Sequence, residues 1–248
     1  MLKTALVTGG AQRVGRAICL GLAEAGYAIA IHYNSSASPA EALAAEIVAA
    51  GGSATSVKAD LNDPAETRSL LERASKELGP IGLLVNNASL FEEDSLARID
   101  DELWDRHFNV HVKAPSLLAS SFAAQDLDDG LIVNMIDERV WKLTPNFTSY
   151  TLSKSTLWTA TKTMAQALAP KIRVNAIGPG PTLPSYRQSQ EDFDLQLQAL
   201  LLKRSPDVSE FANTILYFAS ARSVTGQMIA LDGGQHLGWQ TPDQEAPE

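Results

Sequence analysis

The sequence predicts an α/β fold, with one doubly wound, Rossmann-like domain built on a seven-stranded parallel sheet that carries helices on both faces. Short apolar runs typical of buried strands alternate with longer segments of helical periodicity along the whole chain. A glycine-rich turn, residues 9–15, lies between the first apolar run and the first helical segment. We find no linker, internal repeat or low-complexity tract, so residues 1–248 are expected to form a single domain.

The expected strands are short runs of β-branched and aliphatic residues, each followed by turn residues. Parallel strands need long crossover connections, so the helices between them are expected to cover both faces of the sheet. The strands are predicted at residues 4–8, 27–33, 54–59, 81–86, 131–136, 172–177 and 227–231.

The expected helices begin at capping signals or after glycine-rich turns. Ser38 and Pro39 have the residue types of an N-cap and a first-turn residue. The segment 63–66 has the spacing of a capping box, and Pro115 predicts a kink in a long helix. The helices are predicted at about residues 14–25, 38–51, 63–78, 100–125 and 149–168.

Composition narrows the function classes. The 248 residues are 45% hydrophobic and 20% charged, and the net charge of −9 argues against a nucleic-acid partner because no basic run is present. Cys19 is the only cysteine, so no intrachain disulfide forms, and a reducing compartment is expected. The apolar runs are too short for a signal peptide or a membrane span. These features together predict a cytoplasmic protein without a membrane partner.

The segment TGGAQRVGRAI, residues 8–18, has the composition of a dinucleotide-binding turn. Glycines between a strand and a helix allow a pyrophosphate to approach the backbone and to bind at the helix N-terminus. Glycines can also serve close packing alone, but the order strand, turn, helix favours the binding interpretation.

Tyr150 and Lys154 are four residues apart in a segment that is predicted to be helical, so their side chains share one face. An ammonium beside a phenol favours phenolate, which predicts a lowered pKa for Tyr150 and makes it a candidate proton donor near neutral pH. Asp137 follows the apolar run 131–136, so it is expected at the carboxyl end of a buried strand, where open α/β sheets bind ligands. The alternative is that Tyr150 and Lys154 are ordinary surface residues.

These segments resemble the short-chain dehydrogenase/reductase family, whose turn reads T-G-x-x-x-G-x-G. Other segments match that family in order along nearly the whole chain, namely KADL, NNAS, FNVHVKAP, GPGPT and LDGG. The resemblance implies that Asp60 caps the adenine and that Asn109 and Lys154 hold a water for proton transfer. It also implies that Lys154 binds the nicotinamide ribose.

Arg13 occupies the position of the family's middle glycine. It is either a solvated surface charge or a phosphate ligand, since a guanidinium near the adenosine ribose can hold a phosphate through two parallel hydrogen bonds. An NAD site uses an acidic residue after the second strand, whereas residues 33–36 of this chain are neutral donors that suit a 2′-phosphate. The sequence therefore predicts NADP(H) rather than NAD. The expected cofactor-binding residues are Gly9, Arg13, Val14, Gly15, Tyr33, Asn34, Ser35, Ser36, Asp60, Leu61, Asn87, Ala88, Ser89, Tyr150, Lys154, Pro179, Gly180 and Thr182.

Asp137 stands where the family has a serine, thirteen residues before the tyrosine. An ionised carboxylate cannot donate a hydrogen bond to a carbonyl oxygen and repels a developing alkoxide, so a C=N substrate that takes a proton on nitrogen is a better match. Asp137, the T-G-x-x-x-R turn and the segment NNASLF occur together in this chain. In this combination the chain resembles the pteridine reductases and the similar dihydromonapterin or alternative dihydrofolate reductases. The resemblance implies that Phe91 stacks on a pterin. The expected substrate-binding residues are Arg13, Ser89, Phe91, Asp137 and Tyr150.

We therefore expect an NADPH-dependent reductase that converts a dihydropterin or dihydrofolate to the tetrahydro form. Its catalytic residues are expected to be Asp137, Tyr150, Lys154 and Asn109. One alternative is an NADP-dependent carbonyl or 3-oxoacyl reductase with the same fold. Another is a non-catalytic NADP-binding sensor, which has no need for a complete set of Asn109, Tyr150 and Lys154.

The remaining expectations concern metals, assembly and loops. His107 and His111 have a spacing that can bind a metal, but no third ligand is evident, and packing is the simpler interpretation. The resemblance implies a homotetramer built on residues 100–125 and 149–168 and a substrate loop at 181–206. Residues 239–248 have the composition of a flexible tail, and His236 and Trp239 are hypothesised to reach a neighbouring subunit.

Overall fold

The structure is a computed structural model, and it describes residues 1–185 and 187–239. Its strands form one parallel sheet in the order β3-β2-β1-β4-β5-β6-β7, which confirms the predicted fold class. The strands are β1 (Thr4–Val7), β2 (Ala28–Tyr33), β3 (Ala54–Lys58), β4 (Leu83–Asn86), β5 (Gly130–Met135), β6 (Ile172–Pro179) and β7 (Met228–Leu231).

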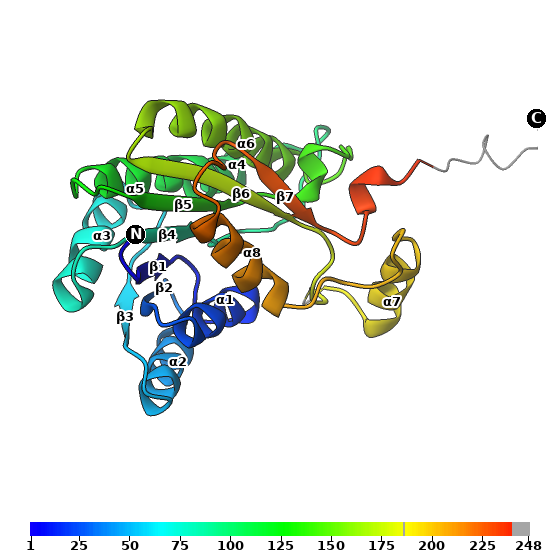
Figure 1. Ribbon diagram of the computed structural model, residues 1–248. Coiled ribbons are helices and arrows are strands. Elements are labelled where there is room, and N and C mark those ends of the chain that lie inside the picture. The colour runs from blue at the N-terminus through cyan, green and yellow to red at the C-terminus, as the bar shows by residue number, and fades with distance from the viewer. Residues whose placement is uncertain (186, 240–248) are drawn as a thin grey trace, which may run out of the picture.

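Helices cover both faces of this sheet (Figure 1). One face carries α1 (Arg13–Glu24), α2 (Ala37–Ala49) and α8 (Ser209–Ser220), and its apolar core includes Ile18, Leu43 and Phe211. The opposite face carries α3 (Pro64–Leu78), α5 (Ala114–Ala123) and α6 (Thr148–Leu168). The other helical segments are α4 (Asp101–Phe108), η1 (Asn109–Lys113), η2 (Glu138–Val140), α7 (Gln190–Gln198) and η3 (Gln235–Leu237). Within residues 1–185 and 187–239, every helix is too short or too polar to cross a lipid bilayer.

The helix predicted over residues 100–125 is divided into three parts. The turn η1 is a π-helix that separates α4 from α5. Pro115, in the first turn of α5, has no N–H for the preceding turn and its ring crowds that turn, which accounts for a local widening of the helix. The predicted kink is therefore a π-helical turn, and it changes which side chains face α6.

Two capping predictions need correction. The helix α2 begins at Ala37 after Ser36, not at Ser38, and Ser36 makes no side-chain capping bond. Asp63 does cap α3, because its carboxylate accepts from the amides of Ala65 and Glu66. The Glu66 carboxylate, however, accepts from the backbone N–H of Asp60 at 2.7 Å, so it ties the end of β3 to α3 instead of completing a capping box.

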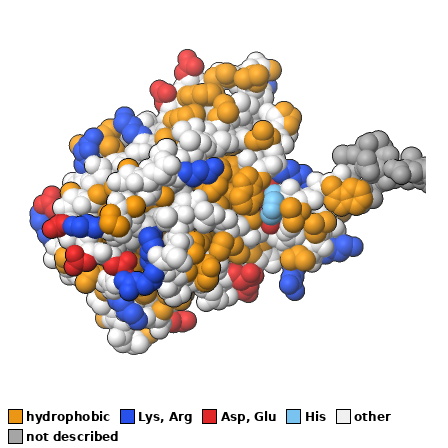
Figure 2. All heavy atoms as spheres, turned by 45° about the horizontal axis from the view of Figure 1, so that its top comes forward, with side chains coloured by type: hydrophobic (Ala, Val, Ile, Leu, Met, Phe, Trp, Pro, Cys, Tyr) orange, Lys and Arg blue, Asp and Glu red, His pale blue; other side chains and the backbone are white. Residues whose placement is uncertain are grey.

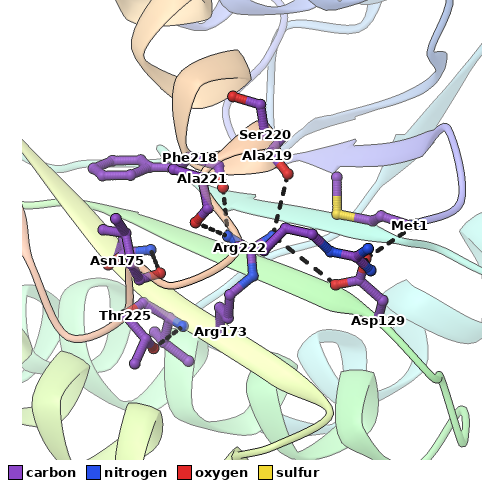
Figure 3. A network of polar contacts seen from close by, with 12 residues as sticks. Met1, Asp129, Arg173, Asn175, Phe218, Ala219, Ser220, Ala221, Arg222 and Thr225 are labelled. Carbon is purple, nitrogen blue, oxygen red and sulfur yellow. Dashed lines mark hydrogen bonds and ion pairs between the residues drawn. The ribbon is translucent and has the colours of Figure 1, made fainter.

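A polar network fixes the C-terminal end of α8 to the sheet (Figure 3). Arg173, in β6, donates to the carbonyl oxygens of Phe218 and Ala221. Phe218 lies in the last turn of α8, and Ala221 directly follows the helix. The guanidinium satisfies carbonyl groups that a helix terminus leaves without partners. Asp129 lies 3.9 Å from Arg173 and also pairs with Arg222 at 2.9 Å. This network holds α8 over the sheet and leads the chain into β7.

Candidate active site

A cavity of about 900 Å³ runs along the carboxyl ends of the strands. It is lined by the turn after β1 and by residues that follow β2, β4, β5 and β6, on both sides of the point where the strand order reverses. Open α/β sheets bind their ligands at this position. Every residue predicted to bind cofactor or substrate lines this cavity.

The glycine-rich turn is held in a compact conformation. Gly9 has a φ of 60°, and a Cβ built on Gly15 would lie 2.2 Å from the Gly9 carbonyl oxygen, so larger residues do not fit there. The backbone N–H of Gly9 donates to Nδ1 of His32 at 3.0 Å, and Nε2 of His32 lies 3.0 Å from the carbonyl oxygen of Ala59. Burial lowers the pKa of His32 to about 4, so the ring is neutral and Nε2 carries its proton. Sequence reasoning missed His32, because its partners come from β1 and from the end of β3.

Thr8 and Asn87 connect this turn to the end of β4. The Thr8 hydroxyl oxygen accepts from the backbone amides of Asn87 and Ala88 at 2.9 and 3.0 Å. The Asn87 side-chain amide donates to the carbonyl oxygens of Thr8 and Gly9 at 2.9 and 3.1 Å. The predicted residues Asn87 and Ala88 thus lie directly beside the glycine-rich turn.

Arg13 has a φ of 51°, a left-handed conformation that glycine adopts more readily. Its guanidinium donates to the carbonyl oxygens of Leu183 and Pro184 at 3.1 and 3.0 Å. The sequence predicted that this group faces the adenosine ribose. In the structure it instead connects the glycine-rich turn to the loop 181–206, while still lining the cavity.

Tyr150, Asp137 and Lys154 lie together at the end of β5. The Tyr150 hydroxyl donates to Oδ2 of Asp137 at 2.7 Å, and the Arg139 backbone amide donates to Oδ1 of Asp137 at 2.9 Å. Nζ of Lys154 donates to the carbonyl oxygen of Met135 at 2.8 Å and lies 5.7 Å from the centroid of the Tyr150 ring. Tyr150 is only 5% exposed and Lys154 only 2%. The group is therefore an interacting phenol and carboxyl with a cation one helical turn away.

The prediction that Lys154 lowers the pKa of Tyr150 is wrong for this arrangement. Burial and the adjacent Asp137 carboxyl raise the pKa of Tyr150 well above its ordinary value. Burial also raises the pKa of Asp137, although the Arg139 amide and Tyr150 oppose that shift. Burial lowers the pKa of Lys154 to about 8. The carboxyl is hydrogen-bonded to the phenol, so burial and this carboxyl dominate the acidity of the phenol.

Asn109 is not brought into the cavity. Among the described residues, Arg106 and Val110 line it but Asn109 does not. The widened turn η1 instead directs His111 toward α6, where its ring lies edge-on to Tyr150 with centroids 5.4 Å apart. The FNVHVKAP segment therefore lies against α6, and the role of Asn109 in holding a water with Lys154 stays a prediction.

Phe91 lies against Tyr150, with ring centroids 4.7 Å apart. Phe147 stacks on Phe91 at 4.3 Å, and the guanidinium groups of Arg139 and Arg187 lie 5.1 and 5.4 Å from its ring. In this structure Phe147 therefore stacks on the Phe91 ring, and the stacking of a pterin on Phe91 stays a prediction. Phe147 has a φ of 58° and precedes α6, and no sequence signal pointed to it.

Glu138 is a second buried carboxyl beside the reacting group. It is 3% exposed, lines the cavity, and its Oε2 has no hydrogen-bond partner among the described residues. Burial, together with the Asp137 carboxyl, raises the pKa of Glu138 to about 7. The sequence did not point to Glu138, because a charged side chain is usually expected to be exposed to solvent.

No group of three metal-ligating side chains occurs in the part of the chain that the structure describes. His107 and His111 each bind a serine of α6 instead, through hydrogen bonds of 2.6 and 2.8 Å. Their spacing serves helix packing at this interface.

The fold and this cavity define the class of protein. A family model described as short chain dehydrogenase matches residues 3–194, and the chain belongs to the short chain dehydrogenase family. A curated relative, the 3-oxoacyl-[acyl-carrier-protein] reductase FabG of Staphylococcus epidermidis, is 32% identical over 244 residues, which cover 96% of this chain and 100% of the relative.

Solved structures give a more similar protein. The crystal structure of FolM alternative dihydrofolate reductase 1 from Brucella suis in complex with NADP is 57% identical, with a TM-score of 0.94 and coverage of 97% of both chains. A blue fluorescent protein from a metagenomic library, in complex with NADPH, is 32% identical with a TM-score of 0.87 and covers 94% of this chain and 97% of its own.

Proposed function

We propose that this chain is an NADPH-dependent reductase that converts a dihydropterin or dihydrofolate ring to its tetrahydro form. The observation that carries this proposal is the carboxyl of Asp137 on the hydroxyl of Tyr150, at 2.7 Å. A family member that reduces carbonyls needs a hydrogen-bond donor at this place, whereas an acid suits a substrate nitrogen that must receive a proton. The similarity to an alternative dihydrofolate reductase agrees.

The residues present fit NADP(H). The compact turn at Gly9 and Gly15 leaves no room for side chains, so a pyrophosphate can approach the backbone and the N-terminus of α1. The first turn of α1 holds no acidic residue, and residues 33–36 place no carboxylate at the cavity wall. Arg13 is at the same wall and can exchange the loop carbonyls for a 2′-phosphate. When bound, the cofactor supplies the hydride.

The chain's own residues then deliver the proton. When Asp137 is protonated, its carboxyl can donate to the Tyr150 oxygen across the same 2.7 Å contact, which leaves the phenol proton free to pass to the substrate nitrogen. As the phenol proton leaves, the Asp137 proton replaces it, so no phenolate forms beside a carboxylate. Hydride on carbon and proton on nitrogen together reduce one C=N bond. Lys154 donates to the Met135 carbonyl oxygen and lines the cavity, where it would bind the ribose of the cofactor.

The second candidate is an NADP-dependent carbonyl or 3-oxoacyl reductase, and the 32% identity to FabG supports the shared fold. Against it stands Asp137, which puts a carboxyl against the developing alkoxide. A third candidate is a non-catalytic NADP-binding sensor. Against that candidate, Tyr150, Asp137 and Lys154 all line the cavity at interacting distances, an arrangement that a sensor does not require.

The test follows NADPH oxidation by absorbance with dihydrobiopterin, dihydromonapterin, dihydrofolate and a panel of ketones and 3-oxoacyl thioesters. We expect turnover with the pterins or the folate and little with carbonyl substrates. Asp137→Ser should lose the ring substrates and gain activity on ketones. Turnover of ketones alone would favour the carbonyl reductase, and NADPH binding without turnover of any compound would favour the sensor.

We also propose a single domain over residues 1–248, a homotetramer and a cytoplasmic location. Exposed hydrophobic side chains near η2 and η3 support the assembly, and Figure 2 shows apolar groups gathered around a histidine on this face. Trp141, Leu237 and Trp239 are 43%, 58% and 66% exposed. His236 binds Asp232 at 2.6 Å, so it is held on its own subunit, and residues 240–248 of the predicted tail lie outside the described residues. Light scattering coupled to gel filtration tests the tetramer.

A further inference from the structure

Two histidine–serine pairs join η1 and α4 to α6. His107 and His111 lie one helical turn apart with stacked rings, 5.6 Å between centroids, and both are buried, at 0% and 1% exposure. Nδ1 of His107 contacts the Ser149 hydroxyl at 2.6 Å, and Nδ1 of His111 contacts the Ser153 hydroxyl at 2.8 Å. The two pairs therefore dock the helices in the same way.

The second nitrogens of the two rings differ. Nε2 of His111 accepts from the backbone N–H of Leu90 at 3.0 Å and lies 3.1 Å from the Ser89 hydroxyl. Nε2 of His107 has only a long contact of 3.5 Å, to the Glu92 amide. Only the His111 nitrogen therefore makes short hydrogen bonds to the cavity rim, where Ser89 and Leu90 line the predicted substrate slot.

The hydrogen-bond partners fix the tautomer of His111. A backbone N–H can only donate, so Nε2 carries no proton and Nδ1 carries the one proton of the neutral ring. Nδ1 therefore donates to the Ser153 oxygen, and the Ser153 hydroxyl in turn donates to the Tyr150 carbonyl oxygen at 2.7 Å. Burial and the positive charge of Lys154 lower the pKa of His111 well below its ordinary value, so the ring stays neutral.

Ser89 faces the same cavity as Tyr150. Its hydroxyl has one proton and lies 3.1 Å from Nε2 of His111, and both Ser89 and Tyr150 line the cavity. While Tyr150 donates its own proton to Asp137, the Ser89 proton is free to go to His111.

We propose that His111 is a positioning residue of this active site: its Nε2 fixes Ser89 and Leu90 at the cavity rim, and its Nδ1 fixes the Tyr150 backbone through Ser153. The inference rests on the proposed reductase function. The role is to hold Ser89, Leu90 and the Tyr150 backbone in place around the proton donor, without entering the proton transfer itself.

Two substitutions test the two ring nitrogens of His111 separately. His111→Asn keeps a polar atom near the Nδ1 position and loses the bonds to Ser89 and Leu90. His111→Gln places an amide oxygen near the Nε2 position and loses the bond to Ser153. His107→Asn is the matched control, because it likewise keeps a polar atom near the Nδ1 position and loses only the long Nε2 contact to the Glu92 amide.

We expect kcat of His111→Asn to fall about 10- to 100-fold with little change in the Kd of NADPH, since misplacement near the reacting atoms costs this order of rate. His111→Gln should restore kcat to within about threefold of wild type, and His107→Asn should keep kcat within about twofold. Equal losses of kcat in His111→Asn and His107→Asn, or an unchanged kcat in His111→Asn, would overturn the proposal. Turnover is measured with whichever compound of the panel the wild type reduces, so the identity of the substrate does not decide the result.

A second measurement needs no turnover. Long-range ¹⁵N–¹H correlation spectra of histidine-labelled protein, assigned with the His111 variants, should show His111 neutral and protonated on Nδ1 throughout about pH 5.5 to 8. A proton on Nε2, or titration inside this range, contradicts the hydrogen-bond scheme even if the reductase function is correct.

Discussion

The two walls of the cavity are built differently. The wall formed by β5 and α6 carries Tyr150 and Lys154 on α6 and Asp137 two residues after β5, and its hydrogen bonds of 2.7 to 2.9 Å join largely buried groups. The second wall comes from residues 181–185 and 187–196, which include part of α7, and Arg13, an exposed side chain, donates to two carbonyl oxygens of this segment.

This difference separates two tasks. Buried bonds on regular elements keep the proton donor at a fixed distance from its partner, which proton transfer requires. Bonds made by exposed arginines stabilise little and weaken with salt, so the loop can exchange its partners at small cost. The rate of proton transfer is therefore expected to depend on the wall formed by β5 and α6. The entry of cofactor and substrate is expected to depend on the wall to which Arg13 is bonded.

The largest expected effect comes from Tyr150→Phe, which removes the proton donor but keeps the ring against Phe91 and His111. We expect kcat to fall by about 10²- to 10⁴-fold, the usual contribution of a general acid, while the Kd of NADPH changes less than about twofold. Stopped-flow turnover and fluorescence titration with NADPH measure the two quantities. A wild-type rate in this variant would remove Tyr150 from the mechanism.

Asp137→Asn tests the proton supply on the same wall. The amide can still contact the Tyr150 oxygen but has no proton to pass, so kcat should fall about 10- to 100-fold. The pKa of Asp137 is raised by burial, and the protonated form is the active one, so wild-type kcat should decline as pH rises through that pKa. The variant should lack this decline. A wild-type pH profile in the variant would show that another group supplies the proton.

Arg13→Ala tests the loop wall. Loss of a guanidinium that can bind the 2′-phosphate should raise the KM for NADPH about tenfold and leave the KM for NADH nearly unchanged. Arg16→Ala is the control, because Arg16 is also exposed and on α1 but pairs with Glu46 at 2.6 Å outside the cavity. Equal effects on both cofactors would mean that Arg13 acts only through the loop.

The smallest effect concerns stability. The pKa of Glu138 is raised from 4.5 to about 7, so the folded chain keeps a proton that the unfolded chain has already released in this interval. The free energy of unfolding therefore falls as pH rises from 4.5 to 7. Glu138→Gln should remove that fall and stabilise the protein at pH 8 by about 1 to 2 kcal/mol, a value discounted for partial solvent screening.

Urea denaturation at several pH values measures this effect. Glu72→Gln is the control, because Glu72 is exposed and pairs with Lys76 on the surface of α3. A Glu138→Gln variant that is no more stable than wild type at pH 8 would show that the carboxyl finds a partner as it ionises.

The sequence by itself determined the sheet, the glycine-rich turn and the residues that line the cavity. Strand periodicity, the residues 9–15 and the carboxyl-end position of Asp137 are local signals, and each is readable from neighbours along the chain. The Tyr150–Lys154 spacing was also local, and the helix that it required is present as α6.

Only the tertiary structure decided which groups control one another. The acidity of Tyr150 depends on Asp137 and burial more than on Lys154, and Phe147 covers Phe91. A π-helical turn sets the His111 ring edge-on to Tyr150, and that turn has no distinct sequence period. Distances between side chains of different elements are set by packing of the whole sheet, and hydrogen bonds and pKa values follow those distances.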